Sequence, residues 1–214
     1  MVVIEGIDPS SSAYETATHP STSYHRDYKY SMKYVYYPAL PPVPDDLIPN
    51  IQEYASKEPF YKEYELHITR NGQVVPPAQQ ALYPVEESVQ QWVRENITNT
   101  WVHMGINMHT TGTVRAHTDR TRDMLLIWFY DLGGPEVDTV YYQERGFPIQ
   151  RERNIFPKTY DELDEIQRFR LPQGRWVMLN TNVIHDVQNI KTKRISFQVA
   201  ITYDCPELSK LVNE

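Results

Sequence analysis

The chain has 214 residues, with 21 basic and 28 acidic side chains and a net charge of −7. This length fits one domain with an appended segment, and the negative charge disfavours sequence-independent binding to nucleic acid phosphates. The longest apolar run, residues 124–130, is far shorter than the ~18 residues of a membrane-spanning helix, so we expect no membrane span. The single cysteine, Cys205, excludes an internal disulfide and a cysteine-rich zinc site. With no apolar leader after Met1, this composition predicts a soluble, cytoplasmic protein.

The first 45 residues differ in composition from the rest. Seven of the 16 tyrosines lie between Tyr14 and Tyr37, and four prolines follow between Pro38 and Pro44. No helical apolar period appears here, and the prolines favour extended chain. We interpret residues 1–45 as an extended arm that lies on the main domain or on a partner. Residues 46–214 are then one domain, with a helical half over 46–100 and a β core over 101–203.

Three local signals lie in the helical half. Asp45 and Asp46 can cap a short helix over residues 47–54. The pair Asn71-Gly72 predicts a hairpin over residues 66–75. After Pro84, apolar residues at helical spacing predict a helix that covers a sheet: Val85, Val89, Trp92, Val93 and Ile97.

From residue 101 onward the pattern is mostly that of strands. Alternation and turn residues predict strands over 102–109, 113–119, 124–130, 138–143, 167–171, 175–180 and 194–203. Many short strands after a helical half are typical of a mainly β fold with flanking helices, built as an antiparallel sandwich or barrel.

The chemically informative feature is His117-Thr118-Asp119, followed much later by His185. Residues two apart in a strand point to the same side, so His117 and Asp119 can reach one metal ion. His185 would complete a set of two histidines and one carboxylate. This set leaves coordination positions open and is associated with non-haem Fe(II) oxygenases. The H-x-D pattern alone is weak, since residues 25–27 repeat it in the arm, where we assign it no role.

The last predicted strand alternates strictly. Its apolar face, expected to pack on the helices, consists of Ile195, Phe197, Val199 and Ile201. Its other face consists of Arg194, Ser196, Gln198 and Ala200. An arginine on an interior face needs an anion, since an unpaired buried guanidinium is costly. A carboxylate held by both branches of the guanidinium is an obvious partner.

The ordered pattern His117-Thr118-Asp119, His185 and Arg194-Ile195-Ser196 resembles the Fe(II)/2-oxoglutarate-dependent dioxygenase superfamily. Residues 174–201 are similar to its aspartyl/asparaginyl β-hydroxylase-like branch, and the whole resemblance covers roughly residues 100–203. It implies a double-stranded β-helix (jelly-roll) core, with Fe(II) bound by His117, Asp119 and His185. It also implies that Arg194 and Ser196 hold the far carboxylate of 2-oxoglutarate. The implied reaction consumes O₂, converts 2-oxoglutarate to succinate and usually hydroxylates a substrate.

Strand alternation suggests further pocket residues. In residues 102–109, His103, Asn107 and His109 share one face, and we assign Asn107 and His109 to the cofactor pocket. The alternative is a polar side facing solvent. Arg115 shares the metal face of its strand, and we take Arg115, Arg120 and Arg122 as candidate contacts for an acidic substrate. A structural ion pair or a solvated charge cluster is the alternative for these arginines.

We therefore predict a 2-oxoglutarate-dependent hydroxylase of a small molecule or of a peptide side chain. Residues 1–45 and the connection 144–166 would shape the substrate mouth. One alternative is a non-catalytic, cupin-like jelly-roll module that binds ligands and forms no succinate. The other is an oxygenase that modifies nucleic acid; the net charge counts against it, while the arginines of residues 115–122 keep it open.

Overall fold

The computed structural model describes residues 34–47, 53–54, 57–59, 61–63, 67–149 and 153–212. Most of the predicted arm, including His25 and Asp27, lies outside these residues. So does most of the short helix predicted over 47–54.

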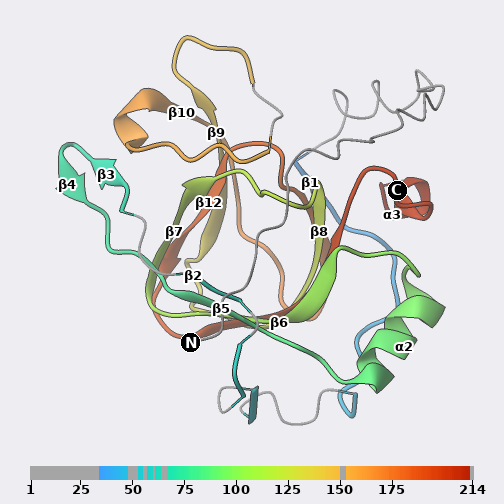
Figure 1. Cartoon of the computed structure of the whole chain (residues 1–214). Helices are drawn as coiled ribbons and strands as arrows, with labels where there is room; N and C mark the ends of the chain where they lie inside the picture. Colours follow the sequence, from blue (N-terminus) through green and yellow to red (C-terminus); the bar gives the residue numbers. More distant parts are fainter. Residues whose placement is uncertain are drawn as a thin grey trace, which may run out of the picture.

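Two antiparallel sheets face each other and form the core of the domain (Figure 1). The seven-stranded sheet has the order β1-β11-β8-β13-β6-β5-β2, and the four-stranded sheet has the order β10-β9-β12-β7. The strands of the larger sheet are β1 (Val35–Tyr36), β2 (Tyr61–Glu63), β5 (Gln80–Tyr83), β6 (His103–His109), β8 (Met124–Leu132), β11 (Trp176–Asn180) and β13 (Arg194–Ile201). Those of the smaller sheet are β7 (Gly112–His117), β9 (Asp138–Glu144), β10 (Leu163–Phe169) and β12 (His185–Ile190).

The order of the strands makes the core a jelly roll. From β6 to β13, each strand is followed by one in the opposite sheet, apart from the β9–β10 hairpin. This repeated crossing winds the chain into a double-stranded β-helix, so the predicted fold class is confirmed. Both sheets have an interior face, and side chains that alternate along each strand either enter that interior or leave it.

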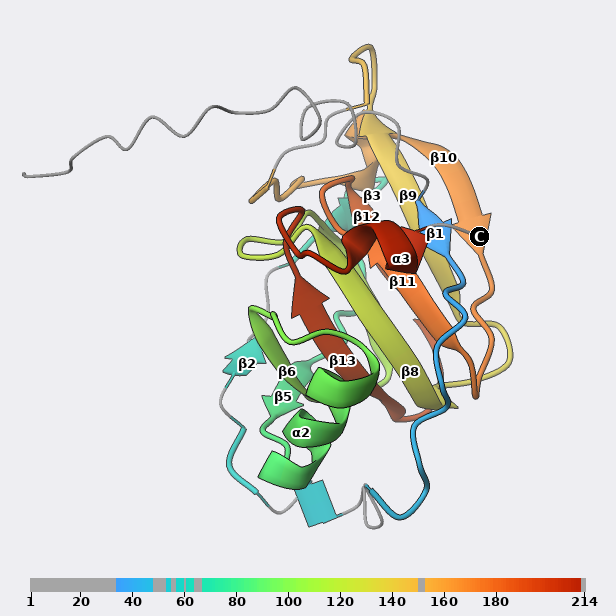
Figure 2. The same cartoon turned by 90° about the vertical axis from the view of Figure 1, so that its right-hand side faces the viewer.

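Helices cover the outer face of the larger sheet (Figure 2). Helix α2 (Glu87–Asn96) buries the predicted apolar stripe against Phe197, Val199 and Ile201 of β13, so both predicted faces are confirmed. The short helix α3 (Leu208–Val212), which the sequence pattern does not predict, adds Leu208 and Leu211 to the same cluster. Neither α2 nor α3 is long and apolar enough to span a membrane.

The space between the two sheets changes character along β13. Ala200 lies in an apolar cluster with Ile127 and Phe129 of β8 and Tyr141 of β9. The preceding positions on the same face, Gln198, Ser196 and Arg194, are polar but equally buried. A polar interior is costly unless its groups find partners, so this end of the barrel is where a ligand site is expected.

Several smaller elements complete the fold. The predicted hairpin is confirmed: strands β3 (Thr69–Arg70) and β4 (Gln73–Val74) flank Asn71 and Gly72, both at positive φ, as a tight two-residue turn requires. Besides α3, the elements without a counterpart among the predicted ones include β2, β5, β12 and the short 3₁₀ helix η2 (Tyr160–Glu162). Strand β10 begins four residues earlier than the predicted strand over 167–171.

The end of the predicted arm packs on the domain. Strand β1 pairs with β11 at the edge of the larger sheet, and the Asn180 amide donates to the Tyr34 carbonyl over 2.9 Å. Further along, the Trp176 indole donates to the Pro41 carbonyl over 2.8 Å, and Val43 is buried in the apolar cluster that includes residues of α2 and β13. Residues 34–43 therefore belong to the wall of the barrel.

Candidate functional site

The structure brings His117, Asp119 and His185 together. One ligand atom from each residue lies within 4.8 Å of the other two. His117 ends β7, and His185 begins β12 directly opposite it in the smaller sheet. Two residues from distant parts of the chain therefore meet because their strands are neighbours, and Asp119 joins them from the segment that follows β7.

Asp119 reaches this position although β7 ends at His117, two residues earlier than the predicted strand. Main-chain hydrogen bonds to other segments hold the residues that follow β7. The Thr118 amide donates to the Ile155 carbonyl over 2.9 Å, and the Asp119 amide donates to the Thr181 carbonyl over 3.0 Å. His117 and Asp119 consequently point to the same side, with 3.4 Å between His117 Nε2 and Asp119 Oδ1.

Both imidazoles are oriented in the same way by the main chain. His117 Nδ1 lies 2.8 Å from the Arg115 carbonyl, and His185 Nδ1 lies 2.9 Å from the Val183 carbonyl. Because a carbonyl oxygen can only accept, each Nδ1 carries a proton, and in the neutral imidazole each Nε2 then keeps its lone pair. This arrangement is the one that a metal-binding histidine requires.

The protonation states of His185 and Asp119 also suit a metal. Burial lowers the pKa of His185 to about 4, with a further contribution from His117. Burial alone would raise the pKa of Asp119, but Arg122 and the two imidazoles outweigh it and hold this pKa well below its usual value. Near neutral pH the site offers neutral nitrogen and an ionised carboxylate, which are the forms that bind metal ions.

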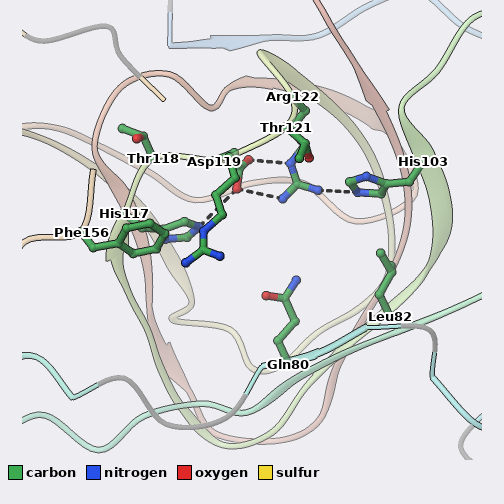
Figure 3. Close-up of a pocket in the computed structure, with 10 residues that line it drawn as sticks. Gln80, Leu82, His103, His117, Thr118, Asp119, Thr121, Arg122 and Phe156 are labelled. Atoms are coloured by element: carbon green, nitrogen blue, oxygen red, sulfur yellow. Dashed lines mark hydrogen bonds and ion pairs between the residues drawn. The ribbon is translucent and has the colours of Figure 1, made fainter. Parts of the chain in front are cut away.

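Arg122 grips the carboxylate of Asp119 (Figure 3). Its Nε lies 2.5 Å from Oδ2 and its Nη2 lies 3.1 Å from Oδ1, while its Nη1 lies 2.9 Å from His103 Nε2. A guanidinium can only donate, so His103 accepts through Nε2 and is neutral; burial and Arg122 lower its pKa to about 4. Arg122, a candidate substrate contact in the sequence, is thus engaged with Asp119.

Arg194 is buried with only 4% of its surface exposed. It lies opposite His109 of β6, and its guanidinium carbon is 4.7 Å from the centre of the Phe129 ring. Within the described part of the chain it forms no ion pair, and its Nε has no hydrogen-bond partner. Burial lowers its pKa to about 10, so the side chain remains charged at neutral pH.

Other polar side chains of β6 and β13 share this interior, and several of their atoms lack hydrogen-bond partners among the described residues. Three buried atoms have no hydrogen bond, namely Asn107 Oδ1, His109 Nδ1 and Gln198 Oε1. Ser196 lies opposite Asn107 and accepts a hydrogen bond from Gln198 over 3.2 Å. Buried polar atoms almost always have partners in folded proteins, so this cluster is built for a polar ligand. Arg194, Ser196, Asn107 and His109, predicted for the cofactor pocket, lie together here.

A cavity of about 280 Å³ lies beside the three residues. Besides His117 and Asp119, it is lined by His103, Arg120, Arg122, Gln80, Leu82 and Phe156. Gln80 and Leu82 face the other lining residues from β5, across the cavity (Figure 3). Arg115 is not among the lining residues: it lies against Phe156 and donates to the Pro157 carbonyl over 3.3 Å.

Three of these lining residues have no role in the sequence-based prediction: Gln80, Leu82 and Phe156. For Phe156 a partial signal exists, because it lies in the connection 144–166 that was expected to shape the substrate mouth. Gln80 and Leu82 alternate, but the prolines on both sides of this segment conceal the strand.

Comparison with known proteins gives structural similarity only. No family model and no curated protein matches the chain. Among solved structures, an oxidoreductase of the 2OG-Fe(II) oxygenase family from Burkholderia pseudomallei is 9% identical, with a TM-score of 0.46 over 85% of this chain and 92% of that one. A prolyl-4-hydroxylase from Pseudomonas putida is 10% identical, with a TM-score of 0.37 over 75% and 88%. HygX from Streptomyces hygroscopicus, with nickel and 2-oxoglutarate bound, is 11% identical, with a TM-score of 0.38 over 78% and 82%. At such identities and TM-scores, these similarities assign no function to this chain.

Proposed function

We propose that this protein is an Fe(II)- and 2-oxoglutarate-dependent oxygenase that hydroxylates a small molecule or a peptide side chain. The observation that carries the proposal is the convergence of His117, Asp119 and His185 in the same barrel interior as the buried, unpaired Arg194. Within the superfamily, the resemblance of residues 174–201 favours the aspartyl/asparaginyl β-hydroxylase-like branch.

The donor set fits a ferrous ion. His117 and His185 supply two imidazole nitrogens that main-chain carbonyls have already oriented, and Asp119 supplies an ionised oxygen. Asp119 also accepts from Arg122, but each carboxylate oxygen has two lone pairs, so Oδ1 keeps one for a metal. Two imidazoles and one carboxylate leave room for further ligands, as an oxygenase needs.

The polar interior fits 2-oxoglutarate. A buried cation without an acidic partner is stabilised by a bound anion, and the fork of Arg194 matches a carboxylate. The unpaired atoms of Asn107, His109 and Gln198 offer hydrogen bonds to the same ligand. His109 stays neutral, because burial and the positive charge of Arg194 lower its pKa. Neutral His109 therefore adds no charge beside Arg194.

Bound iron and 2-oxoglutarate would supply the oxidation, in which O₂ and 2-oxoglutarate yield succinate, carbon dioxide and a hydroxylated substrate. The chain would hold both groups and keep bulk water away. Phe129 and Tyr141 contribute to the second task, since both are buried between the sheets and their rings lie beside Arg194 and His185.

The test is succinate formation from 2-oxoglutarate with Fe(II) under air, with Arg175→Gln as the control variant. We expect wild-type protein to convert 2-oxoglutarate slowly without substrate, and His117→Ala to lose this conversion. In Arg194→Lys, the 2-oxoglutarate concentration needed for half-maximal rate should rise about 10- to 100-fold. Succinate formation that is the same in wild type and His117→Ala would refute the proposal.

One observation favours a second candidate, a non-catalytic jelly-roll binding module. The ion pair with Arg122 satisfies Asp119 without a metal. A module of this kind would bind 2-oxoglutarate or another dicarboxylate at Arg194 and would not convert it. Binding of 2-oxoglutarate without any succinate, in a protein shown to contain iron, would select this candidate.

A further inference from the structure

The cavity beside the proposed metal site carries positive charge, although the chain as a whole has a net charge of −7. Its charged lining residues are Asp119, Arg120 and Arg122. Arg122 is bound to Asp119, so those two charges offset each other. Arg120 is exposed and has no acidic partner among the described residues. Among the described residues that line the cavity, Arg120 is therefore the cation without an acidic partner, and a bound metal would add to its positive charge.

The ring of Phe156, which lines the cavity, also contacts Arg115, which does not line it. The guanidinium carbons of Arg115 and Arg120 lie 4.9 Å and 5.1 Å from the centre of the Phe156 ring. The ring face attracts each cation but does not neutralise either of them.

The same ring lies against the proposed metal site. Phe156 stacks on His117 with 6.2 Å between ring centres and an angle of 15° between the rings (Figure 3). A molecule whose anionic end is held at Arg120 would therefore extend over His117 and toward Asp119. Across the cavity, Leu82 offers an apolar surface and Gln80 an amide for the rest of that molecule (Figure 3).

We propose that the cavity takes an anionic small molecule as substrate, with its carboxylate or phosphate held by Arg120 beside Arg115. That the bound molecule is a substrate rests on the proposed oxygenase function. The existence of the anion site does not depend on that function. The anion site is distinct from the proposed co-substrate site, because Arg194 is not among the residues that line the cavity. A cavity of about 280 Å³ suits a small molecule.

The test is an NMR titration of the folded chain with inorganic phosphate and with acetate, following the arginine Nε–Hε resonances. Acetamide is the uncharged counterpart of acetate. We expect both anions to shift the Arg120 resonance and acetamide to leave it unchanged. The anion with the higher affinity identifies whether a phosphate or a carboxylate is preferred.

Three variants separate this site from other arginines. Arg120→Gln should weaken anion binding about 10-fold, the loss typical of one charge-assisted hydrogen bond. Arg175→Gln is the matched control, since Arg175 is also exposed and stacks on an aromatic ring, that of Tyr37, at 4.8 Å; it should change nothing. Binding that is unaffected by Arg120→Gln, or is lost only in Arg194→Gln, would overturn the inference.

Failure of the inference and failure of the proposed function give different results. Anion binding that depends on Arg120, in a protein that never converts 2-oxoglutarate, would retain the anion site and refute the oxygenase. If the protein converts 2-oxoglutarate but neither anion shifts the Arg120 resonance, the oxygenase function is retained and the anion site is refuted.

Discussion

Arg194 of β13 lies directly opposite His109 of β6, and each carries a buried nitrogen without a hydrogen bond among the described residues. A charged guanidinium beside a neutral imidazole gains little from that neighbour. The fold therefore holds Arg194 at a cost to its own stability, and an anionic ligand is the natural compensation.

Replacing Arg194 with methionine should separate stability from ligand binding. Without ligand, we expect Arg194→Met to raise the free energy of unfolding by about 1–3 kcal/mol, since an unpaired buried charge is removed. Wild-type protein with Ni²⁺ should gain about 2.7 kcal/mol from 2-oxoglutarate at 100 times its Kd, and the variant should gain nothing. Urea unfolding with and without 2-oxoglutarate measures both. Lower stability of the variant, together with undiminished stabilisation by ligand, would contradict the assignment.

Removing one of the three proposed metal ligands should abolish tight metal binding. We expect His117→Ala to weaken Ni²⁺ binding about 100-fold or more, because two remaining ligands hold the ion poorly. Calorimetric titration of Ni²⁺ is the measurement, and circular dichroism checks the fold. The exposed His67 provides the control: His67→Ala should bind Ni²⁺ like wild type. Equal affinity in the two variants would place the metal elsewhere.

Arg122 should act as a positioning residue for Asp119. It holds both carboxylate oxygens and reaches His103, so its loss frees Asp119 to rotate away from His117. We expect Ni²⁺ affinity to fall about 10-fold in Arg122→Ala and by less in Arg122→Lys, which keeps one donor. Arg120→Lys is the control and should leave Ni²⁺ affinity unchanged. A rise in affinity for Arg122→Ala would show that repulsion between Arg122 and the metal outweighs positioning.

Asp123 should contribute to the stability of the fold and not to metal binding. It is buried and accepts from Arg153, from the Asn182 amide over 2.6 Å and from the Tyr203 backbone over 2.9 Å. Asp123→Ala leaves these donors unpaired, so we expect a loss of about 2–4 kcal/mol in the free energy of unfolding. Asp131→Ala, which removes one bond to the Gly133 amide, should cost about 1 kcal/mol or less. Denaturant unfolding of both variants checks the difference, and unchanged stability of Asp123→Ala would contradict it.

Asp161 should give a small dependence of local stability on pH. Its carboxylate accepts from the Asn71 backbone over 2.9 Å, and this bond holds its pKa below the usual 3.8. A carboxylate with a lowered folded pKa contributes stability that is complete above the unfolded pKa and is lost as pH falls through the folded one. NMR titration of the Asn71 amide should therefore show a midpoint below pH 3.8, absent in Asp161→Asn. A midpoint at or above 3.8 would refute this.

The best sequence-based predictions came from segments whose side chains alternate between two environments. In β13 the apolar Phe197 and Val199 alternate with polar residues, so the helix-facing side and the interior side were both predicted correctly. Helix α2 was predicted for the same reason, since Val89 and Val93 recur at helical spacing under a sheet.

Strand β12 was missed because polar residues are buried on both of its faces, His185 on one and Asp186 and Gln188 on the other. Asp186 accepts from Tyr160 over 2.7 Å and from Gln188 over 2.8 Å, and Tyr142 bonds to the same carboxylate oxygen. Tyr142 and Tyr160 come from β9 and η2, so only the folded chain shows why a strand with this composition can be buried. From the sequence alone, a segment with so many polar residues is predicted to be a surface loop.

The candidate site also contains features that the sequence predicts and features that only the folded chain shows. The spacing of His117 and Asp119 is local and predictable, whereas the grip of Arg122 on Asp119 and on His103 depends on how the segment after β7 turns. Phe156 reaches the cavity through a long connection without periodicity, so no spacing rule could place it beside His117.

Both imidazoles of the site are held through carbonyls of their own strands or turns, two residues earlier in the chain. No other side chain is needed to fix which ring nitrogen is free. The surrounding wall of Gln80, Leu82 and Phe156 can therefore be replaced during evolution or design without disturbing that tautomer. A scaffold of this kind is well suited to acquiring new substrates by changing its lining alone.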